Sequence, residues 1–155
     1  MEKEDAVSPV IATILMVAIT VVLAATVYIL VSHYTTGAST PLAATITEQS
    51  ETSTSAILSL SYTTPASMSN PAGVTITISG GAVGSAVSFT GFKAGTFSVT
   101  SGVYTATIAN PDGTTSVIES GATITITDSS AITWSGVTVT LTYTGYTGSA
   151  TTTLP

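Results

Sequence analysis

The sequence predicts an α+β protein, in which one long hydrophobic α-helix at the N-terminus precedes an all-β Ig-like sandwich domain. Two observations support this prediction. Residues 8–31 contain no charged side chain, and the chain beyond them is a succession of short segments in which apolar residues alternate with Ser and Thr. The first pattern is typical of a helix surrounded by lipid or protein, and the second is typical of strands with one face in a core.

The helix is predicted to begin at Ser8 and Pro9. A serine caps free backbone N–H groups, and a proline fits the first helical turn because it has no N–H to lose. The 23 residues from Pro9 to Val31 extend about 35 Å as a helix, which exceeds the roughly 30 Å of a membrane hydrocarbon layer. We therefore expect residues 7–36 to form a helix that can anchor the chain in a membrane, and residues 37–41 to form a hinge.

Small and hydroxyl-bearing residues recur along this helix. Ala18, Ala25 and Ser32 are spaced seven residues apart, as are Thr13 and Thr20. Such residues let helix backbones approach closely, and their hydroxyls bond either back to their own helix or across to a neighbour. We expect these five residues to take part in helix–helix assembly; the alternative is that they simply fill a membrane anchor.

Residues 42–155 are predicted to form the β domain. Turn residues such as Asn70-Pro71 and Gly80-Gly81 separate the alternating segments. Strands of this length with turns every 8–12 residues indicate a two-sheet sandwich, although a barrel would have the same signature. The predicted strands cover residues 44–48, 56–63, 74–79, 86–92, 96–100, 103–108, 115–119, 122–128, 137–143 and 150–154.

The alternation also predicts which side chains form the core, because successive residues of a strand point to opposite faces. Trp134, the single tryptophan, is expected in the core or at a sheet edge. The remaining predicted core residues are Ile57, Leu60, Val74, Ile76, Ile78, Phe89, Phe97, Val103, Ile108, Ile124, Ile126, Val139 and Leu141.

Charged side chains are rare in this chain. Two Lys stand against eight Asp and Glu, which gives a formal net charge of −6 at pH 7. Binding to a nucleic-acid backbone requires several Lys or Arg side chains, so we expect no nucleic-acid partner. The absence of cysteine excludes disulfides and thiol chemistry.

Few residues are suited to catalysis or metal binding. With His33 as the only histidine, we expect no enzyme activity, no cofactor and no metal site. Asp112, Glu119 and Asp128 are either calcium ligands or turn residues, and the turn positions of Asp112 and Asp128 favour the second interpretation. No N-glycosylation sequon begins at Asn70 or Asn110. Any sugar is therefore expected on Ser or Thr, as O-glycosylation.

The stretch from Ala6 to Ala25, AVSPVIATILMVAITVVLAA, resembles the N-terminal segment of archaeal type IV pilins. The resemblance implies a precursor held in the membrane, trimmed by a prepilin peptidase and built by the pilus assembly machinery into a helical filament with a core of helices. It also implies that residues 1–6 are a leader peptide cleaved between Ala6 and Val7. Asp5 stands where such leaders usually carry Lys or Arg, so a retained leader is the alternative.

The leading functional hypothesis is a structural subunit of an extracellular archaeal type IV pilus on the cell surface, which serves adhesion or cell contact. One alternative is a membrane-anchored monomeric cell-surface binding protein that never polymerises. A second is an archaellin, the subunit of a motility filament. A third, a secreted hydrolase, lacks a catalytic constellation.

Overall fold

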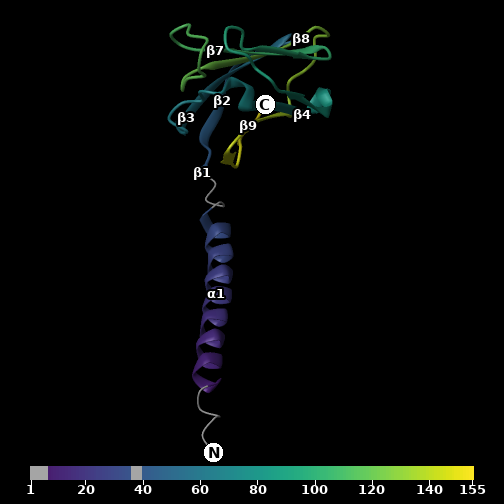
Figure 1. The fold of residues 1–155 in the computed structure, drawn as a ribbon. Coiled ribbons are helices and arrows are strands. Elements are labelled where there is room, and N and C mark those ends of the chain that lie inside the picture. The colour runs from purple at the N-terminus through teal and green to yellow at the C-terminus, as the bar shows by residue number, and fades with distance from the viewer. Residues whose placement is uncertain (1–6, 36–39) are drawn as a thin grey trace, which may run out of the picture. The chain divides into compact units, whose positions relative to one another are not determined.

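A computed structural model describes residues 7–35 and 40–155 of the chain. The chain forms two compact units, Met1–Ala38 and Ser39–Pro155 (Figure 1). The first contains helix α1 (Val7–Thr35), within which the side chains from Pro9 to Ser32 are described. The second consists of strands and their connections. This arrangement confirms the predicted α+β class.

Two antiparallel sheets make up most of the second unit. In spatial order, the four-stranded sheet contains β11 (Ala150–Thr153), β9 (Val137–Tyr143), β4 (Val74–Gly80) and β5 (Gly84–Phe89). The five-stranded sheet contains β2 (Ala43–Thr52), β3 (Ser55–Thr64), β8 (Thr123–Asp128), β7 (Tyr104–Ala109) and β6 (Ser98–Ser101). A short parallel pair joins β1 (Thr40–Pro41) to β10 (Tyr146–Thr147). The 3-10 turns η1 (Pro71–Gly73) and η2 (Gly81–Val83) precede and follow β4.

The strand order has the form that an Ig-like sandwich requires. In such sandwiches strands A, B, E and D form one sheet, and strands C, F and G form the other. The neighbours β2, β3, β8 and β7 follow the first order, and β4, β9 and β11 follow the second, with β5 and β6 as additional edge strands. The sheet edges also meet, because β11 lies beside β2 and β5 lies beside β6. Membership of an Ig-like family remains a prediction.

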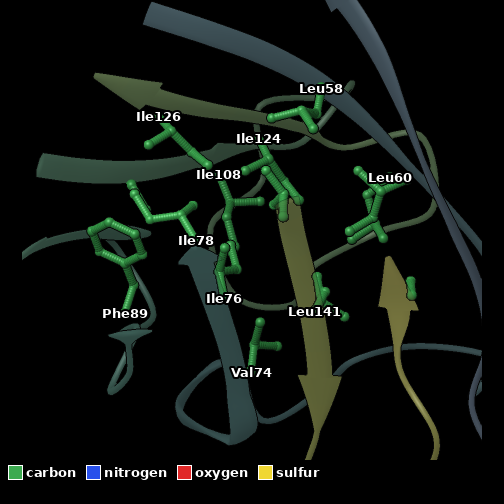
Figure 2. Packing of buried hydrophobic residues seen from close by; sticks show 14 of the residues in the cluster. Leu58, Leu60, Val74, Ile76, Ile78, Phe89, Ile108, Ile124, Ile126 and Leu141 are labelled. Carbon is green, nitrogen blue, oxygen red and sulfur yellow. The ribbon is translucent and has the colours of Figure 1, made fainter. Parts of the chain in front are cut away.

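The core lies between the two sheets. Figure 2 shows side chains of both sheets packed together, among them Leu58 and Ile124 from the five-stranded sheet and Ile76 from the four-stranded sheet. Trp134 is only 2% exposed and packs edge-on against the ring of Tyr104, which confirms its predicted place in the core. The other predictions confirmed as buried are Leu60, Val74, Ile76, Ile78, Phe89, Phe97, Ile108, Ile124, Ile126, Val139 and Leu141.

Two predicted core residues are wrong. Ile57 lies on the outward face of β3, because its neighbours Ala56 and Leu58 point inward and are fully buried. Ile57 and Leu60 are three residues apart, so a strand cannot place both on one face. Val103 is 47% exposed because it lies in the two-residue turn between β6 and β7, beside Gly102, whose φ is 64°.

The predicted strand at 115–119 is also wrong. The amide of Asn110, which is 8% exposed, organises this segment as a loop. Its Nδ2 donates to the carbonyl oxygens of Thr114 and Val117, and its Oδ1 accepts from the backbone N–H of Glu119. These bonds take up backbone groups that a strand would use in its ladder, so only an isolated bridge from Ile118 to the backbone of Met68 remains.

Two residues of the predicted hinge at 37–41 belong to a strand. Thr40 and Pro41 form β1 and pair with Tyr146 and Thr147. Residues 36–39, which include the start of the predicted hinge, lie outside the described residues.

The buried phenol of Tyr62, on β3, forms hydrogen bonds to the loop around Ile118. The hydroxyl of Tyr62 donates to the carbonyl oxygen of Ile118 and accepts from the backbone N–H of Met68 at 3.3 Å. Burial raises the pKa of Tyr62 above its ordinary value of 10.0, because removal from water disfavours the charged phenolate.

Adjacent residues on β3 give a direct test of which face is buried. In residues 40–155, we expect Leu58→Ala to lower the free energy of unfolding by about 2–5 kcal/mol, because it leaves a cavity in a fully buried site. Ile57→Ala on the outward face should cost about 1 kcal/mol or less. Urea unfolding of this fragment measures both. Equal losses would contradict the assigned faces, and a fragment without cooperative unfolding would contradict the independence of the domain.

Tyr62 predicts a loss of stability in alkali. The unfolded phenol ionises near its ordinary pKa of 10.0, whereas the folded phenol stays protonated to a higher pH. Above pH 10.0 the unfolded state therefore binds fewer protons than the folded state. The contribution of Tyr62 to the free energy of unfolding is complete below pH 10 and declines as pH rises toward the folded pKa. Tyr62→Phe should be less stable at neutral pH but decline less steeply between about pH 9 and pH 12. Denaturant melts across this range compare the two chains, and parallel declines would contradict this assignment.

Candidate assembly helix

The surface of α1 is apolar around its whole circumference. From Pro9 to Ser32 its mean hydropathy is 2.8 and none of this stretch is buried against the rest of the chain. Each of its large apolar side chains from Val10 to Val31 is at least 51% exposed. By length and composition this helix can cross a membrane. Such a surface is not stable in water, so it requires lipid or protein around it.

An apolar environment explains why this sequence is helical. Val, Ile and Thr are abundant in α1 and are weaker helix formers than Ala or Leu in water. In a medium without water, however, each backbone N–H and C=O group needs a partner within the segment, and a helix provides these partners. In such a medium, backbone pairing stabilises the helical form of this sequence more than intrinsic propensity does.

The hydroxyls of α1 bond back to their own helix. Thr13 donates to the carbonyl oxygen of Val10 and Thr20 to that of Val17, both at 2.9 Å. Ser32 donates to Tyr28 O at 3.1 Å. The sequence leaves open whether these hydroxyls bond within their own helix or across to a neighbour, and the structure contains the intrahelical bonds. A hydroxyl that already has an acceptor costs less to bury than a free one.

Thr26 belongs to the same group, although the sequence analysis did not select it. Its hydroxyl donates to the carbonyl oxygen of Leu23 at 2.9 Å. It does not share the seven-residue spacing of the other residues, so a search based on spacing misses it. The presence of a hydroxyl within an apolar run is the signal that identifies it.

The five predicted assembly residues form two rows rather than one. At 100° per residue, a spacing of seven residues returns to nearly the same side of a helix. The row of Thr13 and Thr20 is offset by five residues from the row of Ala18, Ala25 and Ser32, which corresponds to about 140° around the axis. The two rows therefore face different sides of α1.

The processing site is described only in part. Ala6 lies outside the described residues, and Val7 is the first residue of α1 with its side chain not described. Cleavage between these residues remains a prediction. Tyr28, near the C-terminal end of α1, is 75% exposed. The side chains of Tyr34 and His33 lie outside the described set.

The acidic residues considered as calcium ligands have turn roles. Asp112 Oδ1 accepts from the backbone N–H of Thr114 at 2.8 Å, and Asp128 Oδ1 accepts from that of Ser130 at 2.9 Å. The backbone N–H of Glu119 bonds to Asn110. Within the described ranges, no three His, Cys, Asp or Glu side chains are close enough together to hold a metal ion.

Comparison with known proteins gives one result. Residues 5–45 match the family model described as archaeal type IV pilin, N-terminal, a range that includes all of α1 and the first residues of β2. No curated protein and no solved structure matches the chain. The family match agrees with the apolar, fully exposed helix and with the residues that carry the resemblance. Residues 5–45 are thus similar to the N-terminal segment of archaeal type IV pilins.

Proposed function

We propose that this chain is a structural subunit of an extracellular archaeal type IV pilus, which polymerises through α1 and serves adhesion or cell contact. The observation that carries this proposal is the charge-free surface of α1, exposed on every side, within the segment that matches the pilin family. Lipid covers this surface in the precursor, and α1 helices of other copies cover it in the filament.

The two rows on α1 support polymerisation rather than simple dimerisation. A two-fold dimer uses the same patch on both copies, whereas a filament uses two different patches on each copy. Rows about 140° apart on one helix provide two such patches. Their residues are small or have hydroxyls bonded within the helix, so neighbouring helices can approach closely without leaving a polar group unsatisfied.

The β domain forms the outer surface of the filament in this proposal. Its buried residues run from Ile46 to Leu154, so the core is formed without any residue of α1. Adhesion then depends on its outward side chains, which are largely Ser and Thr and are acceptors for O-glycosylation. A prepilin peptidase and the pilus assembly machinery are the partners in assembly, and the role is structural rather than enzymatic.

Two alternatives share the helix but differ in what they predict. A membrane-anchored monomer gives no filament, and an archaellin gives a filament whose loss abolishes swimming. Electron microscopy of material sheared from cells, with mass spectrometry of the subunit N-terminus, separates the first from a pilus and locates the cleavage site. Motility of a deletion strain separates the second.

Substitutions at two adjacent residues test assembly through α1. Val17→Asp should abolish filaments, since an unpaired charge in an apolar core costs several kcal/mol per subunit. Ala18→Leu adds bulk to one row without adding charge, so the precursor should remain in the membrane while filaments are lost. Val17→Leu is the matched control and should assemble. Counts of filaments per cell, beside the amount of subunit in the membrane fraction, measure the effect. Normal filaments from Ala18→Leu would exclude that row from the helix contacts.

The scarcity of charge predicts resistance to acid. The hydrogen bond from the Thr114 backbone lowers the pKa of Asp112 below its ordinary 3.8. The contribution of Asp112 to the free energy of unfolding is therefore present above pH 3.8 and is lost only as pH falls through the lowered pKa. Asp112 is exposed, so solvent keeps this contribution small. We expect the melting temperature of filaments to change little from about pH 7 to about pH 3. A sharp loss of filaments near pH 4, or a strong dependence on salt, would show that a few carboxylates dominate stability.

A further inference from the structure

One end of the β domain has an open pocket. It lies between the turn that joins β2 to β3 and the connection from β8 to β9, and its volume is about 390 Å³. Small-molecule sites have volumes of roughly 300–1,000 Å³, so the pocket has room for a small ligand. Its walls include Glu51 and Ser53 on one side and Ile132, Thr133, Trp134 and Ser135 on the other.

The pocket lies at the end of the domain opposite to the covalent connection with α1. The chain enters the domain at β1, which begins at Thr40, and β2 follows from Ala43. β2 then runs for ten residues to Thr52, a distance of about 33 Å. Loops held by a rigid β scaffold often carry ligand sites. Binding at this end therefore does not involve the connection to α1.

The walls of the pocket are held in place by contacts within the domain. The Thr52 hydroxyl accepts from the backbone N–H of Ser55 at 3.1 Å, which stabilises the turn between β2 and β3. The backbone N–H of Asp128 donates to the carbonyl oxygen of Thr54 at 2.9 Å, so the end of β8 is joined to that turn. Trp134 anchors the other wall in the core. A ligand therefore meets preformed walls, which lowers the entropic cost of binding.

The polar side chains of the walls are available to a ligand. Within residues 7–35 and 40–155, the carboxylate of Glu51 and the hydroxyls of Ser53, Thr133 and Ser135 form no hydrogen bond or ion pair. On the sheets, by contrast, several hydroxyls bond to one another across strands. A carboxylate only accepts hydrogen bonds, whereas a hydroxyl both donates and accepts. The pocket therefore suits a ligand with several hydroxyl groups.

Charge and apolar surface narrow the class of ligand further. Among the described residues, no Lys or Arg lines the pocket, and Glu51 repels an anion. Ile132 and the indole of Trp134 add apolar surface to one wall. A sugar ring combines hydroxyls with apolar C–H groups and has no charge. These features together favour a neutral saccharide.

The indole of Trp134 also has an unused donor. Its N–H is buried and has no hydrogen-bond partner in the described part of the chain. Folded proteins rarely leave a buried donor unpaired. An oxygen from outside the chain is therefore expected beside this wall of the pocket.

We propose that this pocket binds a saccharide and is the adhesion site of the subunit. Hydroxyls of the sugar donate to Glu51 and exchange hydrogen bonds with Thr133, while its C–H groups lie against Ile132 and Trp134. The role in adhesion rests on the proposed function. The binding itself is a property of the β domain and does not require a filament.

The single tryptophan makes a binding test specific, because tryptophan fluorescence of the full chain comes from Trp134 alone. The full chain is kept in a detergent without a sugar headgroup. It is titrated with glucose, galactose, mannose, N-acetylglucosamine and disaccharides of these sugars at millimolar concentrations. We expect at least one of them to change the emission of Trp134 in a saturable manner.

A substitution at Glu51 tests whether the pocket is the site. Glu51→Gln should weaken binding of that sugar about tenfold, because it removes a charged acceptor. Glu48→Gln is the matched control, since it makes the same change three residues earlier on β2 at a position that does not line the pocket. It should bind as the unmodified chain does. If Glu51→Gln does not fold, Thr133→Val removes a hydroxyl from the opposite wall and should also weaken binding.

Three results would overturn the proposal. One is no saturable response to any of these sugars, and another is an equal effect of Glu51→Gln and Glu48→Gln. The third is binding of choline in place of the sugars, because a carboxylate beside an indole also suits an organic cation. Absence of filaments from the unmodified chain, with sugar binding intact, would refute the proposed function and leave the saccharide site standing.

Discussion

A helix that is apolar on every side is unstable in water unless lipid or protein covers it, and the organisation of the chain depends on this constraint. The stretch from Pro9 to Ser32 is apolar and long enough to cross a membrane, so its surface requires lipid or protein around it. Lipid and other copies of the helix are the two apolar surroundings available to a pilin-type segment. Because each lacks free backbone partners, both favour the same helical conformation. In the proposed pilus, α1 therefore passes from lipid to other helices without refolding.

The β domain satisfies the opposite requirement, since it keeps its apolar residues inside. Its core between two antiparallel sheets includes side chains as large as Trp134 and Phe89. Its outward positions are occupied mainly by Thr and Ser, which tolerate water and fit a pleated strand. A surface of hydroxyls stays hydrated with few charges. In the proposed filament, it also avoids the repulsion that a more strongly charged surface would produce between neighbouring copies.

Sequence patterns predict the parts of this structure that depend on residues close together in the sequence. The helix follows from an uninterrupted apolar run, and most strands follow from alternation with a period of two. The errors involve longer-range contacts. The 115–119 segment has a strand-like pattern, but the buried amide of Asn110 takes its backbone groups. β1 depends on partners more than 100 residues away, Tyr146 and Thr147. Ile57 is a different kind of error, because it is apolar on an outward face and the alternation of β3 already excludes it from the face of Leu60.

The assembly residues on α1 remain a prediction that rests on local patterns. Spacing locates Thr13, Thr20, Ala18, Ala25 and Ser32, and helix geometry then separates them into two rows. The hydroxyl bonds to the backbone three or four residues earlier are local, so the residue types already favour them. Which row meets which row of another copy depends on contacts between chains, and a single sequence contains no local pattern for these. The helix thus encodes its need for an apolar covering, whereas the geometry of the proposed filament has no local pattern in the sequence.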